Sequence, residues 1–135
     1  MDARTIAFAV LRRVEEQEAF ANLALDAELS QAGILDPRDA ALATELAYGV
    51  LRRRVALDRA LAPLVRGGLE ALEPKVVDLL RLGAYQLLFT RVPPHAAVGE
   101  TVATARRVGL ARAAGLFDAV LRRLGREGAP PPPDP

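Results

Sequence analysis

The chain has 135 residues, of which 51% are hydrophobic and 26% charged, a composition typical of one globular domain and not of a disordered or membrane-spanning chain. It contains no cysteine and one histidine, which excludes a disulfide framework, a thiol nucleophile and a cysteine-based zinc site. The 18 basic and 17 acidic side chains give a net charge of +1, so nucleic-acid binding would need a local basic patch.

Helical periodicity dominates the first half of the chain. An apolar stripe over residues 3–14 predicts a first helix, and a second is expected to start near Phe20 and end by Gly33. Asp36 is placed to cap a third helix whose first position suits Pro37. This helix is predicted to break near residues 53–55.

The middle of the chain predicts a short helix followed by a long one. Leucines over residues 57–64 indicate the short helix, and Gly67 and Gly68 stop it. Pro74 opens the next helix, which runs to the stretch 91–94, Arg-Val-Pro-Pro. Because apolar residues cover nearly all of its faces, we expect this helix to be the central and most buried one.

Two further helices are predicted after the prolines. The first starts near His95 or Ala96 and is interrupted at Gly109. The second carries an apolar pattern over residues 113–124 and is ended by Gly125 and Gly128. No segment alternates apolar and polar residues with β-branched content, so we predict an all-α fold without strands.

The last residues have a different composition from the rest. Five of the final six residues are proline, so residues 127–135 are predicted to form an extended linker or tail. Such a linker suggests that this chain is the N-terminal part of a longer protein. No apolar signal core precedes a cleavage site, and we expect a soluble cytoplasmic protein with no membrane contact.

Catalytic and metal-binding patterns are absent from the sequence. Without predicted strands there is no strand-borne nucleotide loop, and a lone His95 cannot form a two-histidine metal site. His95 is interpreted as a capping or loop residue beside the prolines. Glu15 and Glu16 form a carboxylate pair, but they are interpreted as a solvated helix face whose charge neighbouring arginines offset. We therefore predict no catalytic, cofactor or metal site in this chain.

Clustered arginines are the more informative feature. All basic residues except Lys75 are arginine, and the charge balance rises from −3 over residues 1–74 to +4 over residues 75–135. Arginine suits bidentate phosphate contacts. The alternative interpretation is that each cluster lies late in its helix and complements the helix dipole. The candidate RNA-binding residues are Arg4, Arg12, Arg13, Arg52, Arg53, Arg54, Arg106, Arg107, Arg122 and Arg123.

Among these, the run at 52–54 is the strongest candidate. Three consecutive helical positions span about 200° and cannot all point inward. No acidic residue follows until Asp58. With only 4% aromatic residues, base stacking is not expected to be the main mode of RNA binding, and backbone contacts should dominate.

Three segments resemble a known family. LRLGAYQLLFTRVPPHAAVGETVATARRVG, residues 80–109, is similar to the most recognisable stretch of the NusB family. DAALATELAYGVLR, residues 39–52, and FDAVLRR, residues 117–123, resemble segments of one branch of it. That branch is the NusB-like N-terminal domain of the Sun/Fmu family of rRNA (cytosine-C5) methyltransferases. The resemblance covers about residues 3–126, and we predict a NusB-like helical RNA-binding domain over residues 1–126.

The resemblance implies about seven helices in two small antiparallel bundles and a role in RNA recognition. In the methyltransferase branch this domain precedes a catalytic domain that holds S-adenosylmethionine and a cysteine nucleophile. The implied role is a non-catalytic RNA-docking domain that positions the enzyme on ribosomal RNA, with small-subunit rRNA as the implied target. One departure is Asp118, where the family usually has asparagine. Free-standing NusB proteins have an arginine-rich N-terminus, whereas this chain has only Arg4 before Arg12, which disfavours a free-standing antitermination factor.

Two alternatives stay open at this point. One is a free-standing NusB-like antitermination factor that binds RNA together with a ribosomal protein. The other is a helical protein–protein interaction module without RNA contact. The length of the natural reading frame would separate the first interpretation from these two.

Overall fold

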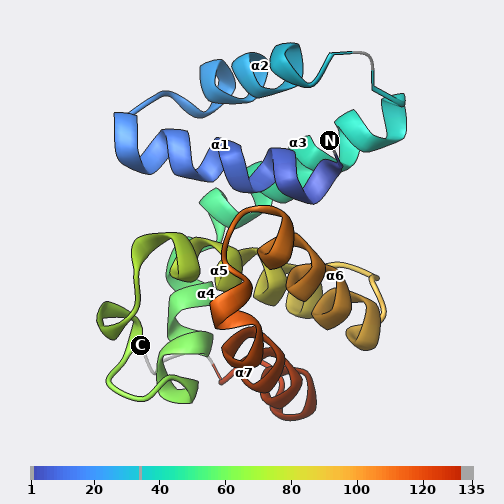
Figure 1. The fold of residues 1–135 in the computed structure, drawn as a ribbon. Coiled ribbons are helices and arrows are strands. Elements are labelled where there is room, and N and C mark those ends of the chain that lie inside the picture. Colours follow the sequence, from blue (N-terminus) through green and yellow to red (C-terminus); the bar gives the residue numbers. More distant parts are fainter. Residues whose placement is uncertain (1, 34, 132–135) are drawn as a thin grey trace.

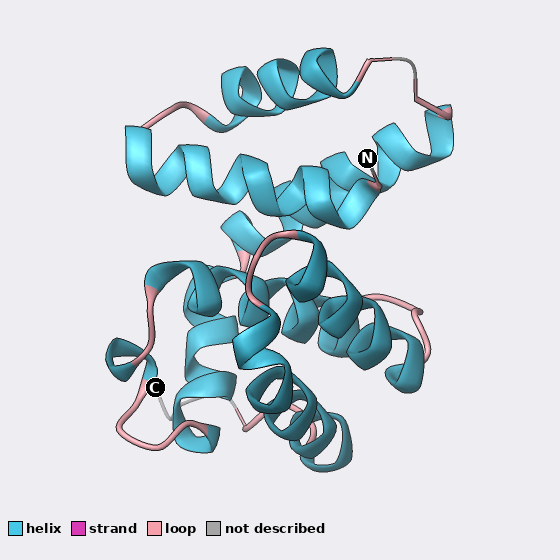
Figure 2. Cartoon of the chain, in the orientation of Figure 1, coloured by secondary structure: helices cyan, strands magenta, loops and turns pink. Residues whose placement is uncertain are grey.

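A computed structural model describes residues 2–33 and 35–131. The described residues form seven α-helices and three short 3₁₀ helices, without strands, as Figure 2 shows. The prediction of an all-α fold is confirmed; residues 132–135 of the predicted tail lie outside the described residues. The α-helices are α1 Ala3–Gln17, α2 Ala21–Ala32, α3 Pro37–Arg52, α4 Arg54–Leu61, α5 Pro74–Phe89, α6 Pro94–Arg107 and α7 Ala114–Glu127.

Several helix starts follow directly from local sequence. The carboxylate of Asp2 accepts a hydrogen bond from the backbone N–H of Thr5 at 2.8 Å and caps α1. Asp36 accepts in the same way from the N–H of Arg38 at 2.8 Å. Proline occupies the first position of α3, α5 and α6, where its missing N–H leaves no helical hydrogen bond unmade.

The helices form two groups that share α5. Figure 1 shows α1, α2 and α3 together at one end and α4 to α7 at the other. Helix α5 packs against α1 and α3 of the first group and against α4, α6 and α7 of the second. Every residue from Val76 to Gln86 is buried, which confirms that α5 is the central helix.

Two predicted details in the second group are wrong. Helix α6 begins at Pro94, one residue from the predicted start near His95, because proline is well suited to the first helical turn. His95 is therefore an exposed helical residue instead of a cap or loop residue. Gly125 lies inside α7, which continues to Glu127 because the apolar face of this helix extends through Leu124. Gly128, with a φ of 73°, ends it.

Two helical glycines allow close packing around α5. A Cβ atom on Gly49 of α3 would overlap the ring of Tyr85. A Cβ atom on Gly83 would lie 2.6 Å from a methyl carbon of Leu121 in α7 and 2.8 Å from the hydroxyl of Thr101 in α6. Both glycines therefore serve packing within the chain, because a larger side chain at either position would push α5 away from a neighbouring helix.

The lengths of the helices bear on membrane insertion. In the described part of the chain, no helix combines the length and apolar character needed to cross a bilayer.

Candidate nucleic-acid interface

Six of the ten predicted arginines lie beside carboxylates. An arginine with a carboxylate partner adds less positive potential to the surface than a free one. The paired arginines are Arg4 with Glu100 at 3.8 Å, Arg12 with Asp78 at 2.8 Å, Arg13 with Glu28 at 3.4 Å, Arg107 with Asp2 at 2.8 Å, Arg122 with Asp118 at 3.0 Å, and Arg123 with Glu127.

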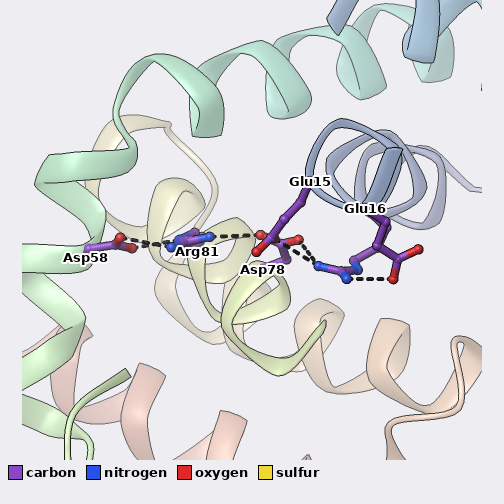
Figure 3. A network of polar contacts seen from close by, with 6 residues as sticks. Glu15, Glu16, Asp58, Asp78 and Arg81 are labelled. Carbon is purple, nitrogen blue, oxygen red and sulfur yellow. Dashed lines mark hydrogen bonds and ion pairs between the residues drawn. The ribbon is translucent and has the colours of Figure 1, made fainter. Parts of the chain in front are cut away.

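The most extensive of these pairings joins the two groups of helices. Figure 3 shows the chain of contacts from Asp58 through Arg81 to Asp78, and from there to the α1 side chains. Arg81 donates to both oxygens of Asp58, at 2.7 and 2.9 Å, and to Asp78 at 3.0 Å. Arg12 donates to Asp78 at 2.8 Å and also to Glu15 and Glu16. Arg12 is only 12% exposed, so this network holds α1, α4 and α5 together.

The network shifts the protonation equilibria of its members. Burial disfavours the charged form of Arg81, but hydrogen bonds and the charges of Asp58 and Asp78 outweigh burial and raise its pKa. Burial and the neighbouring charge of Asp78 raise the pKa of Glu15, although Arg12 acts in the opposite direction. Ionisation of Glu15 therefore opposes folding, and the resulting loss of stability develops as pH rises through its raised pKa.

The arginines at 52–54 have a different environment. Arg52 ends α3, Arg53 joins α3 to α4, and Arg54 begins α4. All three side chains are exposed, and in the described ranges no carboxylate lies within ion-pair distance of any of them. We call these three residues the 52–54 cluster. Its predicted exposure is confirmed.

The backbone explains how the cluster is presented. Arg53 has φ −108° and ψ 19°, which breaks the helix between α3 and α4 within the predicted range. Its guanidinium lies over the ring of Phe89, with the central carbon 4.1 Å from the ring centroid. Arg54 borders a shallow pocket with Glu15, Asp78 and Arg81. Arg52 and Arg53 are therefore the members best placed to meet an external anion.

The remaining candidate, Arg106, belongs to another element. It is exposed in the last turn of α6, and within the described residues it lacks an ion-pair partner. The helix-dipole interpretation suits Arg106 and its neighbour Arg107. It does not suit the pairs at 12–13 and 122–123, which lie before the last turns of α1 and α7.

Sequence reasoning missed the residues that follow α5. Thr90 ends α5, and its hydroxyl donates to the carbonyl of Gln86 at 2.6 Å and accepts from the N–H of Val92 at 3.2 Å. Exposed Arg91 lies between them. An open groove of about 580 Å³ separates this turn from α3; we call it the α3 groove. Its lining residues are Leu42, Glu45, Leu46, Phe89, Thr90, Arg91 and Val92.

A second groove contains the family departure at Asp118. It has a volume of about 440 Å³ and lies between α6 and α7, and its lining includes the buried side chains of Val98 and Leu121. Asp118 accepts a hydrogen bond from Arg122 at 3.0 Å. The acid thus offsets the charge of Arg122 at the rim of this groove, and a phosphate contact is less favourable here than at the 52–54 cluster.

In the part of the chain that the structure describes, no group of three histidine, cysteine or acidic side chains is placed to hold a metal ion. The described features define an all-helical domain with one uncompensated arginine cluster. The chain belongs to the NusB family, which matches residues 1–126.

Longer proteins are similar to the same region. The chain is 48% identical over 126 residues to a Mycobacterium tuberculosis protein, covering 93% of this chain and 27% of that protein. It is 41% identical to the ribosomal RNA small subunit methyltransferase B of Pseudomonas putida, and the match covers 95% of this chain and 29% of that protein. The protein of the same name in Xanthomonas campestris is 39% identical, and the match covers 96% of this chain and 31% of that protein. The chain thus spans less than a third of these relatives.

A solved structure has the same fold. A chain in the structure described as "Crystal Structure of a Plectonemic RNA Supercoil" superposes with a TM-score of 0.83 and covers 92% of this chain and 91% of its own length. The two sequences are 20% identical, so this likeness shows the fold alone.

Proposed function

We propose that this domain binds RNA and positions an rRNA (cytosine-C5) methyltransferase on small-subunit ribosomal RNA, without itself containing the catalytic site. The observation that carries the proposal is the 52–54 cluster, an exposed run of three arginines free of carboxylate partners among the described residues. Guanidinium groups bind phosphate oxygens in bidentate geometry, and phosphate contacts dominate sequence-independent RNA affinity. Membership of the NusB family and similarity to rRNA methyltransferases support this assignment.

The proposal assigns the chemistry to another part of the enzyme. Methyl transfer from S-adenosylmethionine through a cysteine nucleophile needs groups that this chain does not supply, since it has no cysteine. Nor do the residues described here offer a strand-borne glycine-rich loop of the kind that holds a nucleotide cofactor. We therefore place the cofactor in a methyltransferase domain that acts together with this one in the cytoplasm. A ribosomal protein as a further partner stays a prediction.

We expect the triple variant R52A/R53A/R54A to bind single-stranded RNA more weakly at low salt than the unchanged chain. If Arg52 and Arg53 each contact one phosphate, the slope of log K against log salt falls in magnitude by roughly 1.4, at about 0.7 per contact on a single strand. Fluorescence anisotropy of a labelled RNA measured across a salt series gives this slope.

A matched control separates local from total charge. R112A/R122A/R123A removes the same number of positive charges, but these arginines pair with Glu73, Asp118 and Glu127. We expect the control to retain most of the slope. A folded R52A/R53A/R54A protein whose slope is unchanged would contradict the assignment. It would favour the alternative that the three arginines complement the helix dipole at the C-terminal end of α3.

A further inference from the structure

We propose that the α3 groove binds one unpaired RNA base that carries an exocyclic amino group, with Glu45 accepting a hydrogen bond from that group and arginines at the groove's ends contacting the adjoining phosphates. This inference rests on the proposed RNA-binding function and deepens it, because it adds base recognition to phosphate binding.

One wall is a single row of α3 side chains. Residues three, four and seven positions apart lie on the same side of a helix. In this row Leu42 is partly exposed and provides apolar surface, Leu46 is fully buried, and Glu45 is exposed. Continuing by seven positions from Glu45 leads to Arg52. The row therefore begins with apolar Leu42, continues with the carboxylate of Glu45 and ends at the 52–54 cluster.

The other wall is the turn after α5. The two hydrogen bonds of the Thr90 hydroxyl fix this turn, and Pro93 follows it, so the wall is formed before any ligand arrives. Phe89 lines the groove and also lies beneath the guanidinium of Arg53. Because Arg53 is held against the ring, less side-chain entropy is lost when it meets a ligand. Exposed Arg91 supplies a positive charge at this wall.

The groove's chemistry distinguishes between ligand groups. A phosphate placed against Glu45 would be repelled, whereas phosphates beside Arg91 and the 52–54 cluster would be attracted. Leu42 and Phe89, both partly exposed, provide apolar and aromatic surface of the kind on which a base packs. A carboxylate accepts a hydrogen bond from the amino group of cytosine but is repelled by the carbonyl oxygen that uracil has in that position. An unpaired amino-bearing base with phosphates on both sides satisfies all of these groups.

The test compares oligocytidine and oligouridine of about 12 nucleotides, a length within the range of single-strand sites. Anisotropy titrations at neutral pH with the 135-residue chain should show about tenfold tighter binding of the cytidine oligomer, the factor expected for one good base contact. In E45Q the ratio should fall to about one, because an amide can also donate to the uracil oxygen. The F89L variant should bind the cytidine oligomer more weakly while keeping an apolar side chain.

The E127Q variant is the control for the role of Glu45. E127Q removes an exposed carboxylate from α7, outside the α3 groove, and should leave the ratio at its original value. Equal affinity for the two oligomers, or a ratio that E45Q does not change, overturns the groove proposal while salt-dependent binding through the 52–54 cluster still stands. Absence of binding to either oligomer at low salt overturns both this inference and the proposed function.

Discussion

Replacing Arg81 by alanine should lower the free energy of unfolding by about 3 kcal/mol, the lower part of the range for removing one partner of a buried ion pair. The Arg81 side chain is 9% exposed and that of Asp78 is 5% exposed, so water cannot replace the lost hydrogen bonds fully. Asp58 would also lose both of its bonds to the guanidinium. Urea unfolding followed by circular dichroism measures the change.

Two further variants test the cause of this loss. R123A removes an ion pair with Glu127 in which both side chains are more than half exposed, and we expect a change within about 0.5 kcal/mol. R81K keeps the charge but not the bidentate geometry, so its stability should fall between those of the unchanged protein and R81A. Equal losses in R81A and R123A would show that burial of the network contributes nothing.

Replacing Gly49 by alanine should destabilise the fold by about 1–3 kcal/mol, the usual cost of overpacking a core. The added methyl group would overlap the ring of Tyr85, which is buried and confined. Helices α3 and α5 would have to move apart to admit it. Thermal and urea unfolding of the variant measure the loss, and chemical shifts of the Tyr85 ring would report the displacement.

The matched substitution is at Gly99. This glycine also lies inside a helix, α6, but nothing lies within 4 Å of the position that its Cβ atom would occupy. Alanine has the higher helix propensity, so G99A should stabilise the protein by up to about 1 kcal/mol. A fall in the free energy of unfolding for G49A and a rise for G99A would separate the effect of packing from that of helix propensity. A gain in stability in G49A would contradict the close packing of α3 on α5.

Much of the fold is predictable because its signals are local. The cap at Asp36 and the proline at position 74 lie within one helical turn of the helix starts that they define. Apolar residues cover nearly all faces of α5, and this pattern alone identifies it as the central helix without any knowledge of its neighbours. The predictions for His95 and Gly125 are wrong because proline and glycine are typical helix stops, whereas Pro94 and Gly125 both occupy helical positions here.

The candidate site was only partly predictable, for a different reason. Exposure of the 52–54 cluster follows from three consecutive positions in one turn, which is local information. The burial of Arg12 depends on Asp78, 66 residues away, which reaches it only when α1 packs on α5. Likewise, Glu45 and Arg91 share a groove only after α3 and the turn following α5 have come together. Hydrophobic periodicity in one helix does not indicate which charged side chain of another helix will face it.

The central position of α5 and the outer position of α2 imply unequal resistance to local opening. Helix α2 buries few residues and packs mainly on α1 (Figure 1), whereas α5 is enclosed by helices of both groups. Amide hydrogen exchange should therefore be slowest in α5, limited by global unfolding, and faster in α2, limited by local detachment. The two walls of the α3 groove come from α3 and the end of α5, so α2 can exchange its amide protons with solvent while the proposed RNA surface stays assembled.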